Sequence, residues 1–326
     1  MAKAVRLYET GGPEVLRYED VEVGQPGPGQ VRMRHVAVGL NYADTYFRNG
    51  TYPVPMPSGI GVEAAGVVQE LGEGVTHLAV GDRVTYTGFI DTLGAYSTER
   101  LISAAPLIRL PETIAFETAA AMTMRGLTSA YLMRRIYPFK QGDTLLLHAA
   151  AGGVGLIVAQ WARLLGITVI GTVSTEEKAE LARAHGCDEI IYYRREDVAT
   201  RVKELTDGKG VTTVYDTVGK DTYEGSLKSL KRRGVLVGCG TASGPFPPID
   251  ALQLAIQGSV YFTRPALADF IADPVERAEL SNALFGHVAN GRIKIEINQR
   301  YQLQDAVQAH RDMEAGKTTG SSIFVI

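Results

Sequence analysis

The chain has 326 residues, of which 45% are hydrophobic and 21% are charged, a balance typical of a globular protein with one large domain or two ordinary ones. Its net charge of −3 argues against nucleic acid or an anionic membrane as the main partner. The two cysteines, Cys187 and Cys239, are too few for a disulfide framework or a cysteine-rich zinc site. No apolar run is long enough to cross a bilayer, and we expect a soluble cytoplasmic protein.

The first third of the chain is predicted to be rich in β-strands. Residues 31–34 alternate between apolar and basic side chains, and residues 65–68 and 83–86 are further short apolar runs between glycine turns. The prolines at positions 53, 55 and 57 predict an extended loop. Residues 115–131 are rich in Ala, Met and Leu and predict a helix.

From residue 144 onward the sequence predicts strands and helices in regular alternation. The predicted strands are residues 144–148, 168–172, 190–192, 211–215 and 234–237. The predicted helices are residues 155–165, 175–185, 197–205 and a segment around Ser226. Such alternation is typical of a parallel sheet covered by helices on both faces.

The alternation ends near Arg264 and Pro265. Asp273 and Pro274 predict a helix start, and Gly291 predicts its end. A strand, a helix over residues 303–315 and a last strand over residues 322–325 complete the chain.

A glycine-rich loop, Ala150-Ala151-Gly152-Gly153-Val154-Gly155, lies between the first strand and helix of this alternation. It approximates G-x-G-x-x-G, with Ala150 at the first glycine position. Gly152 permits close approach to a pyrophosphate, Gly155 permits tight packing of helix on strand, and the N–H groups of Gly153 and Val154 open the helix toward the phosphates. A ligand-free glycine turn is the alternative, but the surrounding strands and helix favour a dinucleotide.

The form of the dinucleotide is read at the end of the second strand. An NAD enzyme carries Asp or Glu there, whereas this chain has Ser174, with Lys178 one helical turn later. A hydroxyl, an ammonium and helix N–H groups suit a 2′-phosphate, to which Tyr192 and Arg194 add a stacking surface and a second cation. We predict NADPH. Ser174 can alternatively be the N-cap of the following helix, with Glu177 completing a capping box.

Six stretches of the chain resemble a known family. They are residues 11–16 (GGPEVL), 41–46 (NYADTY), 61–66 (GVEAAG), 81–84 (GDRV), 148–155 and 215–219 (YDTVG). The chain resembles the zinc-free quinone oxidoreductases of the medium-chain dehydrogenase/reductase superfamily, a group that includes the zeta-crystallins. The resemblance implies an α/β fold with two domains. A GroES-like β-rich catalytic domain would cover residues 1–125 and 265–326, and a Rossmann domain with a doubly wound parallel sheet would cover residues 126–264. It also implies a homodimer through the Rossmann sheet edges, here near residues 259–262.

The metal ligands of the zinc-dependent relatives are missing. Those relatives have Cys where this chain has Asn41 and His where it has Val62, and they carry a four-cysteine lobe where residues 86–100 contain no cysteine. We therefore expect no metal.

A quinone can accept electrons from a reduced nicotinamide with only hydrogen-bond help. The resemblance places Asn41, Tyr46 and Tyr52 around the substrate, where an amide and two phenols can stabilise a carbonyl oxygen as it gains charge. Ordinary loop packing is the alternative for these residues. Loops at the carboxyl ends of the later strands are expected to complete the cofactor site. These candidates are Val218, Cys239, Gly240, Phe262 and Arg264, with Thr128 and the loop near Gly320 as further family-based candidates.

The sequence therefore predicts an NADPH:quinone reductase. The alternatives are an NADPH-dependent reductase of α,β-unsaturated carbonyls and a non-catalytic protein, since some relatives are lens crystallins or bind RNA. The charge pattern gives no basic stripe for RNA. His148 is interpreted as a core histidine, the two cysteines as inert, and residues 316–318 (GKT) as a helix end, because no P-loop glycine stands at Arg311.

Overall fold

The computed structural model describes all 326 residues, which divide into two compact units. Unit 1 consists of Met1–Leu127 and Ile271–Ile326, and unit 2 is Thr128–Phe270. Helix α2 (Phe116–Tyr131) carries the chain from the first unit into the second. None of the helices combines the length and the apolar composition that a membrane crossing requires.

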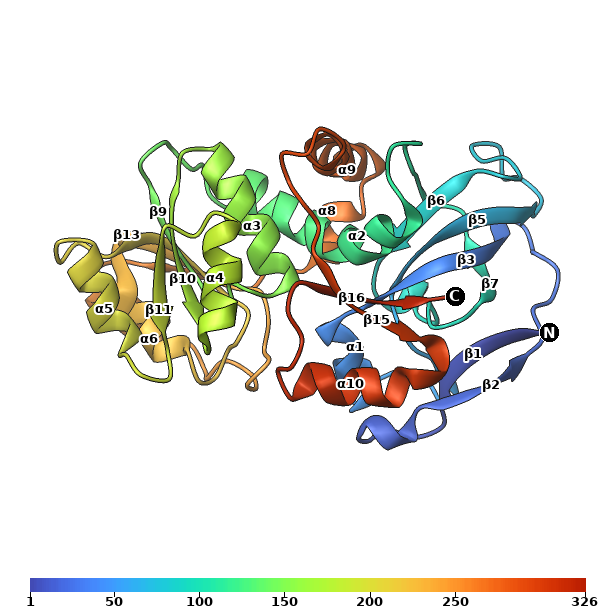
Figure 1. Cartoon of the computed structure of the whole chain (residues 1–326), viewed down its shortest axis with the longest axis horizontal. Helices are drawn as coiled ribbons and strands as arrows, with labels where there is room; N and C mark the ends of the chain where they lie inside the picture. The colour runs from blue at the N-terminus through green and yellow to red at the C-terminus, as the bar shows by residue number, and fades with distance from the viewer. The chain divides into compact units, whose positions relative to one another are not determined.

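Unit 2 is built on a six-stranded parallel sheet with the order β11-β10-β9-β12-β13-β14. The chain moves outward from the central pair β9 and β12 in both directions, and right-handed crossovers therefore place helices on both faces. Helix α3 packs on α4 and α5 packs on α6, with the labelled strands of this unit between the two pairs (Figure 1). The strands are β9 (Thr144–Leu147), β10 (Thr168–Val173), β11 (Glu189–Tyr192), β12 (Val211–Asp216), β13 (Leu230–Gly238) and β14 (Tyr261–Thr263). The helical elements are η3 (Leu132–Ile136), α3 (Gly153–Leu164), α4 (Glu176–Ala184), α5 (Val198–Leu205), α6 (Tyr223–Ser229), α7 (Ala251–Ile256) and α8 (Leu267–Ile271), whose last residue falls in unit 1.

The predicted alternation of strands and helices is confirmed in unit 2, with shifted element ends. Helix α3 begins at Gly153, two residues before the predicted start, so that two glycines of the loop lie in its first turn. Strand β13 begins at Leu230 because that residue pairs with Val211 of β12 ahead of an irregularity in the ladder. The edge strand β14 begins at Tyr261, since Ser259 has a φ of +57° and lies outside extended conformation.

Unit 1 contains a seven-stranded mixed sheet and a three-stranded antiparallel sheet. The larger has the order β15-β16-β3-β5-β6-β8 with β7 also paired to β3, and the smaller has the order β2-β1-β4. The strands are β1 (Ala2–Leu7), β2 (Arg17–Val21), β3 (Gln30–Leu40), β4 (Ser58–Gly59), β5 (Glu63–Leu71), β6 (Arg83–Thr87), β7 (Glu99–Ser103), β8 (Ile108–Arg109), β15 (Ile297–Gln302) and β16 (Ser321–Val325). The helical elements are η1 (Pro13–Val15), α1 (Tyr42–Arg48), η2 (Ile90–Thr92), most of α2, α9 (Pro274–Ala289), η4 (Leu303–Asp305) and α10 (Ala306–Glu314). Buried aliphatic side chains of β1, β3 and β5 form its core with Tyr86, Tyr96 and Phe324.

The predicted helix after Asp273 is confirmed in detail. The Asp273 carboxylate accepts from the N–H groups of Val275 and Glu276, both at 2.9 Å, and α9 stops before Gly291, which has a φ of +66°. The sequence did not predict α1, which begins directly after the long strand β3.

Candidate active site

The glycine-rich loop joins β9 to α3 in a conformation that needs its glycines. A Cβ atom on Gly155 would lie 2.6 Å from the main-chain oxygens of both Ala149 and Ala150. At Gly152, the N-cap of α3, a Cβ would lie 3.2 Å from the Ala149 oxygen. The first N–H groups of α3 have no acceptor within the helix, so the loop is a cradle of main-chain donors that fits a pyrophosphate.

The alanine in the first glycine position is accommodated by its surroundings. The Ala150 N–H donates to the oxygen of Thr172 at 3.1 Å, and a Cβ on Gly171 would lie 2.8 Å from the Ala150 methyl. Gly171 of β10 therefore makes the room that Ala150 occupies. The unusual backbone lies one residue earlier, because Ala149 has a φ of +51°.

The residue that caps α4, just after β10, is not the one named in the alternative interpretation of Ser174. The N-cap of α4 is Thr175, whose hydroxyl accepts from the N–H of Lys178 at 3.4 Å. The alternative of Ser174 as N-cap with Glu177 at the third helical position is therefore wrong, because the helix starts one residue later. Ser174 precedes the cap and Lys178 lies in the first turn, and both side chains are partly exposed.

Tyr192 lies beside this position, since it pairs with Val173 in the β10–β11 ladder. Its phenol donates to the Glu176 carboxylate at 2.7 Å, and the Arg195 guanidinium lies 5.6 Å from its ring centroid. Arg194 is exposed. Tyr192 is the last residue of β11 and Arg194 follows it. The predicted stacking surface and second cation thus lie at the carboxyl end of the strand next to β10.

The remaining cofactor candidates of unit 2 follow the carboxyl ends of β12, β13 and β14. The Asp216 carboxylate accepts from the N–H of Val218 at 2.9 Å, which orders the loop after β12. A Cβ on Gly240 would lie 2.4 Å from the Thr217 oxygen, and Arg264 donates to the Gly238 oxygen at 3.1 Å. The structure places Val218, Cys239, Gly240, Phe262 and Arg264 at or just past these strand ends. Thr128 lies in α2 and Gly320 lies in unit 1.

The residues rejected as catalysts are structural. His148 is buried between the hydroxyls of Thr172 and Ser226, each at 3.0 Å, and burial lowers its pKa. Burial also raises the pKa of the Cys187 and Cys239 thiols to about 12. Neither thiol is therefore activated as a nucleophile.

The candidate catalytic residues of unit 1 come from one short segment. Asn41 is the N-cap of α1, Tyr46 lies within that helix, and Tyr52 follows it, with its N–H donating to the Tyr46 oxygen at 2.8 Å. The Tyr46 and Tyr52 rings meet edge to face with centroids 5.2 Å apart. Phe89, which the sequence analysis did not single out, lies 5.1 Å from the Tyr52 ring. Both tyrosines are partly exposed and Asn41 is buried.

A carboxylate missed by the sequence analysis lies against Asn41. Glu63, the first residue of β5, accepts from the Asn41 Nδ2 amide at 2.7 Å and from the Met124 N–H at 2.6 Å. The Arg125 guanidinium lies 3.8 Å from it. Burial raises the pKa of Glu63 to about 7, while Arg125 and the two N–H donors act in the opposite direction. In the sequence, Glu63 could have been noticed because it lies within residues 61–66, one of the six stretches that resemble the family.

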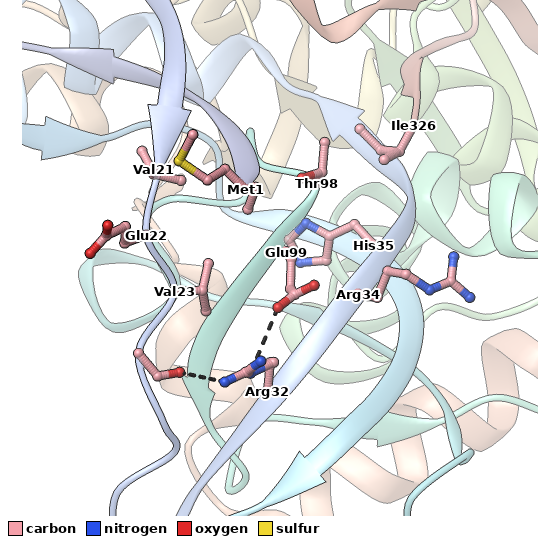
Figure 2. Close-up of a pocket in the computed structure, with 12 residues that line it drawn as sticks. Met1, Val21, Glu22, Val23, Arg32, Arg34, His35, Thr98, Glu99 and Ile326 are labelled. Atoms are coloured by element: carbon pink, nitrogen blue, oxygen red, sulfur yellow. Dashed lines mark hydrogen bonds and ion pairs between the residues drawn. The ribbon is translucent and has the colours of Figure 1, made fainter.

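A hollow of about 760 Å³ in unit 1 does not contain these residues. It is lined by residues of both chain ends and of β3 and β7, including Met1, Arg32, His35, Glu99 and Ile326 (Figure 2). Arg32 is engaged there by Glu99 at 3.7 Å and by the Gly24 oxygen at 2.8 Å, and burial lowers the pKa of His35 to about 3.

The residues do not fit a zinc ion. The chain contains no group of three or more His, Cys, Asp or Glu side chains that could hold a metal. Asn41 and Val62 stand at the positions that would supply ligands, and Asn41 is committed to Glu63. No step of the reaction is therefore assigned to a metal.

Comparison with known proteins matches both units. Residues 27–112 match the alcohol dehydrogenase GroES-like domain, and residues 153–273 match the family described as zinc-binding dehydrogenase. The chain is 50% identical to a quinone oxidoreductase of Pseudomonas aeruginosa and 44% identical to a 2-haloacrylate reductase of a Burkholderia species, over its whole length and 99% or more of theirs. The crystal structure of Escherichia coli quinone oxidoreductase complexed with NADPH superposes with a TM-score of 0.96 at 44% identity, covering 99% of this chain and 100% of that one.

A GroES-like domain combined with a Rossmann-type parallel sheet defines a medium-chain dehydrogenase/reductase. The fold class predicted from the sequence is confirmed. Within this superfamily the chain belongs to the zinc-free quinone oxidoreductases, with which it shares close to half of its residues from end to end.

Proposed function

We propose that this chain is an NADPH:quinone reductase with a cofactor-binding domain at residues 126–264 and a catalytic domain at residues 1–125 and 265–326. The observation that carries the proposal is the full-length agreement with quinone oxidoreductases at up to 50% identity, together with the glycine cradle that opens α3. The overall reaction is quinone plus NADPH plus a proton giving quinol plus NADP⁺. Bound NADPH supplies the hydride.

The proposed cofactor site uses main-chain donors and neutral or basic side chains. The N–H groups of Gly153 and Val154, in the first turn of α3, hold the pyrophosphate, and Ala150 and Gly152 form the turn that lets it approach the main chain. Ser174, Lys178, Tyr192 and Arg194 receive the adenosine 2′-phosphate, because no carboxylate follows directly on β10. Val218, Cys239, Gly240, Phe262, Arg264 and Thr128 complete the site.

Asn41, Tyr46 and Tyr52 bind the quinone in this proposal. One amide N–H and two phenol O–H groups are donors of the kind that stabilise a carbonyl oxygen as negative charge develops on it. The rings of Tyr46, Tyr52 and Phe89 lie in contact with one another. Such a cluster of aromatic rings supports a flat, electron-poor ring as the ligand.

Reduction of an α,β-unsaturated carbonyl is the second candidate. The relative named 2-haloacrylate reductase favours it, at 44% identity over the whole chain. The same donors would serve either acceptor, so the two functions are separated by rate and not by site.

We further propose a cytoplasmic homodimer. Strand β14 is an edge of the parallel sheet, and Tyr261 in it is 59% exposed. Leu252 and Ile256, one turn apart on α7, are 65% and 75% exposed, which supports association at this edge. The two cysteines are unpaired thiols, which is typical of a reducing compartment.

The function is tested by steady-state kinetics with 1,4-benzoquinone and a simple enone at matched NADPH. We expect the larger kcat/KM with the quinone, and a fall of roughly 10- to 100-fold in Asn41→Ala through loss of one donor. Asn49→Ala, at the exposed other end of α1, is the control and should keep wild-type rates. A larger kcat/KM with the enone would replace the first function by the second.

The cofactor assignment is tested by Lys178→Ala. Loss of this ammonium should raise the KM for NADPH by about tenfold and leave that for NADH unchanged, since a charge-assisted contact to phosphate contributes about 1.5 kcal/mol or more. Equal turnover of wild-type protein with both cofactors at low concentration would contradict the assignment.

A further inference from the structure

The Asn41 side-chain amide is held from both ends. As N-cap of α1 it forms a capping box with Asp44: the Asp44 carboxylate accepts from the Asn41 N–H at 2.8 Å, and the Asn41 side chain lies beside the Asp44 N–H, which donates to the Asn41 main-chain oxygen at 3.0 Å. At its other end the Nδ2 group donates to Glu63 at 2.7 Å. The amide oxygen therefore faces α1, and one N–H of the amide faces Glu63. The second N–H is the donor that is left for a ligand.

Glu63 is itself fixed as a double acceptor. One of its oxygens accepts from the main-chain N–H of Met124 at 2.6 Å and the other from Asn41, and its side chain is fully buried. The main-chain donor cannot turn, because it belongs to α2. Burial raises the pKa of Glu63 to about 7, and the nearby Arg125 cation opposes that rise; above this pH the carboxylate is ionised and both oxygens accept.

We propose that Glu63 is a positioning residue that orients the Asn41 amide so that position 41 presents an N–H donor, and not an oxygen, to the quinone carbonyl. The inference rests on the proposed role of Asn41 in binding the quinone. The reacting carbonyl needs a donor, and an amide that was free to turn would present its oxygen part of the time. Glu63 removes that second orientation without touching the substrate.

Glu63→Gln tests this directly. The new side chain has one acceptor and one donor end, and the Met124 N–H claims the acceptor. Two NH₂ groups would then meet between positions 63 and 41, and the Asn41 amide must turn. We expect kcat for benzoquinone to fall by roughly 10- to 100-fold with KM changed by less than about twofold, because the lost donor acts in the transition state.

The matched control exchanges the two side chains in the double variant Asn41→Asp, Glu63→Gln. A carboxylate at 41 accepts from the amide at 63 and can still cap α1, so the hydrogen bond between the positions is restored while the donor is not. We expect the melting temperature to recover toward wild type and kcat to stay low. Recovery of kcat together with the melting temperature would show that no N–H donor is needed at position 41 and would overturn the inference.

Two further measurements separate the outcomes. If Asn41→Ala keeps full activity, the proposed role of Asn41 fails; if Asn41→Ala is impaired and Glu63→Gln is not, the positioning role alone fails. In full-length protein labelled with ¹⁵N-asparagine, the Asn41 NH₂ signal is identified by its loss in Asn41→Ala. One of its protons should be shifted downfield by the carboxylate, and an unshifted pair overturns the inference even where Glu63→Gln does not fold.

Discussion

Asp44 is fully buried, and one of its carboxylate oxygens, Oδ1, has no hydrogen-bond partner. The other oxygen accepts from the Asn41 N–H and from the Tyr96 hydroxyl, each at 2.8 Å. Burial raises the pKa of Asp44 to about 7, and the two donors oppose that rise. Asp44 therefore holds a proton in the folded protein at pH values where it is ionised in the unfolded chain.

The raised pKa makes Asp44 destabilising as pH rises. Between its ordinary value near 4 and about 7 the folded state binds more protons than the unfolded state, so this group lowers stability as pH increases through that window. We predict that Asp44→Asn gains roughly 4 kcal/mol relative to wild type between pH 4 and pH 8. Thermal unfolding at both pH values measures it, with the exposed Asp221→Asn as control. A stability difference independent of pH would show that Asp44 is not protonated on folding.

The candidate catalytic residues differ in how visible they are in the sequence. Asn41, Tyr46 and Tyr52 belong to one segment, and a motif comparison could propose them together. Glu63 reaches Asn41 only because β3 and β5 pair in the sheet, with Val38 opposite Ala64. A contact between residues 22 positions apart is set by register, which the local pattern does not contain.

At the scale of the element, the start of α3 depends on Gly155. Its missing side chain allows the helix to approach the main-chain oxygens of Ala149 and Ala150, and a Cβ would lie 2.6 Å from each. Neither oxygen can move, because the Ala150 N–H is bonded to β10 and the Ala149 oxygen accepts from Gly152 at 2.9 Å.

We therefore predict that Gly155→Ala destabilises the protein by about 1–3 kcal/mol and weakens NADPH binding at least tenfold by displacing the N–H groups of the loop. Gly286→Ala in α9 is the control, since a Cβ there meets nothing within 4 Å and should stabilise the helix by about 0.5–1 kcal/mol. Thermal unfolding and fluorescence titration with NADPH give both numbers. Unchanged affinity in Gly155→Ala would show that the loop does not hold the pyrophosphate.

Element ends were less predictable than the elements. Helix α4 begins after Thr175 and not after Ser174, although both are good caps one residue apart. The choice follows from the end of β10 at Val173, which is held in the sheet by pairing with Tyr192. Capping preferences rank serine slightly above threonine, so they alone would have named the wrong residue.

At the scale of the whole molecule, strand β14 forms an edge of the parallel sheet. A strand at an edge has unpaired main-chain groups, and the exposed apolar side chains of Leu252 and Ile256 lie on the preceding α7. Two copies that join along this edge would cover both features.

We predict a particle of twice the 35.2 kDa chain mass by light scattering after size-exclusion chromatography. Leu252→Glu with Ile256→Glu should shift it toward the monomer at micromolar concentration, because two buried charges cost several kcal/mol. Val80→Glu, on a side chain that is 63% exposed in unit 1, is the control and should remain dimeric. A wild-type monomer, or a double variant that stays dimeric, would contradict association through this edge.

By itself the sequence determined the strand and helix alternation of unit 2, the glycine cradle, the missing zinc ligands and the family, because each is written in local periodicity or in residues a few positions apart. Only the tertiary structure decided that Gly171 makes room for Ala150, that Thr175 caps α4, and that Glu63 holds Asn41. The first and last of these contacts join residues from different strands and helices, and the position of the cap depends on where β10 ends. Their geometry follows from sheet register and from the packing of helices on strands, which are properties of the folded chain as a whole.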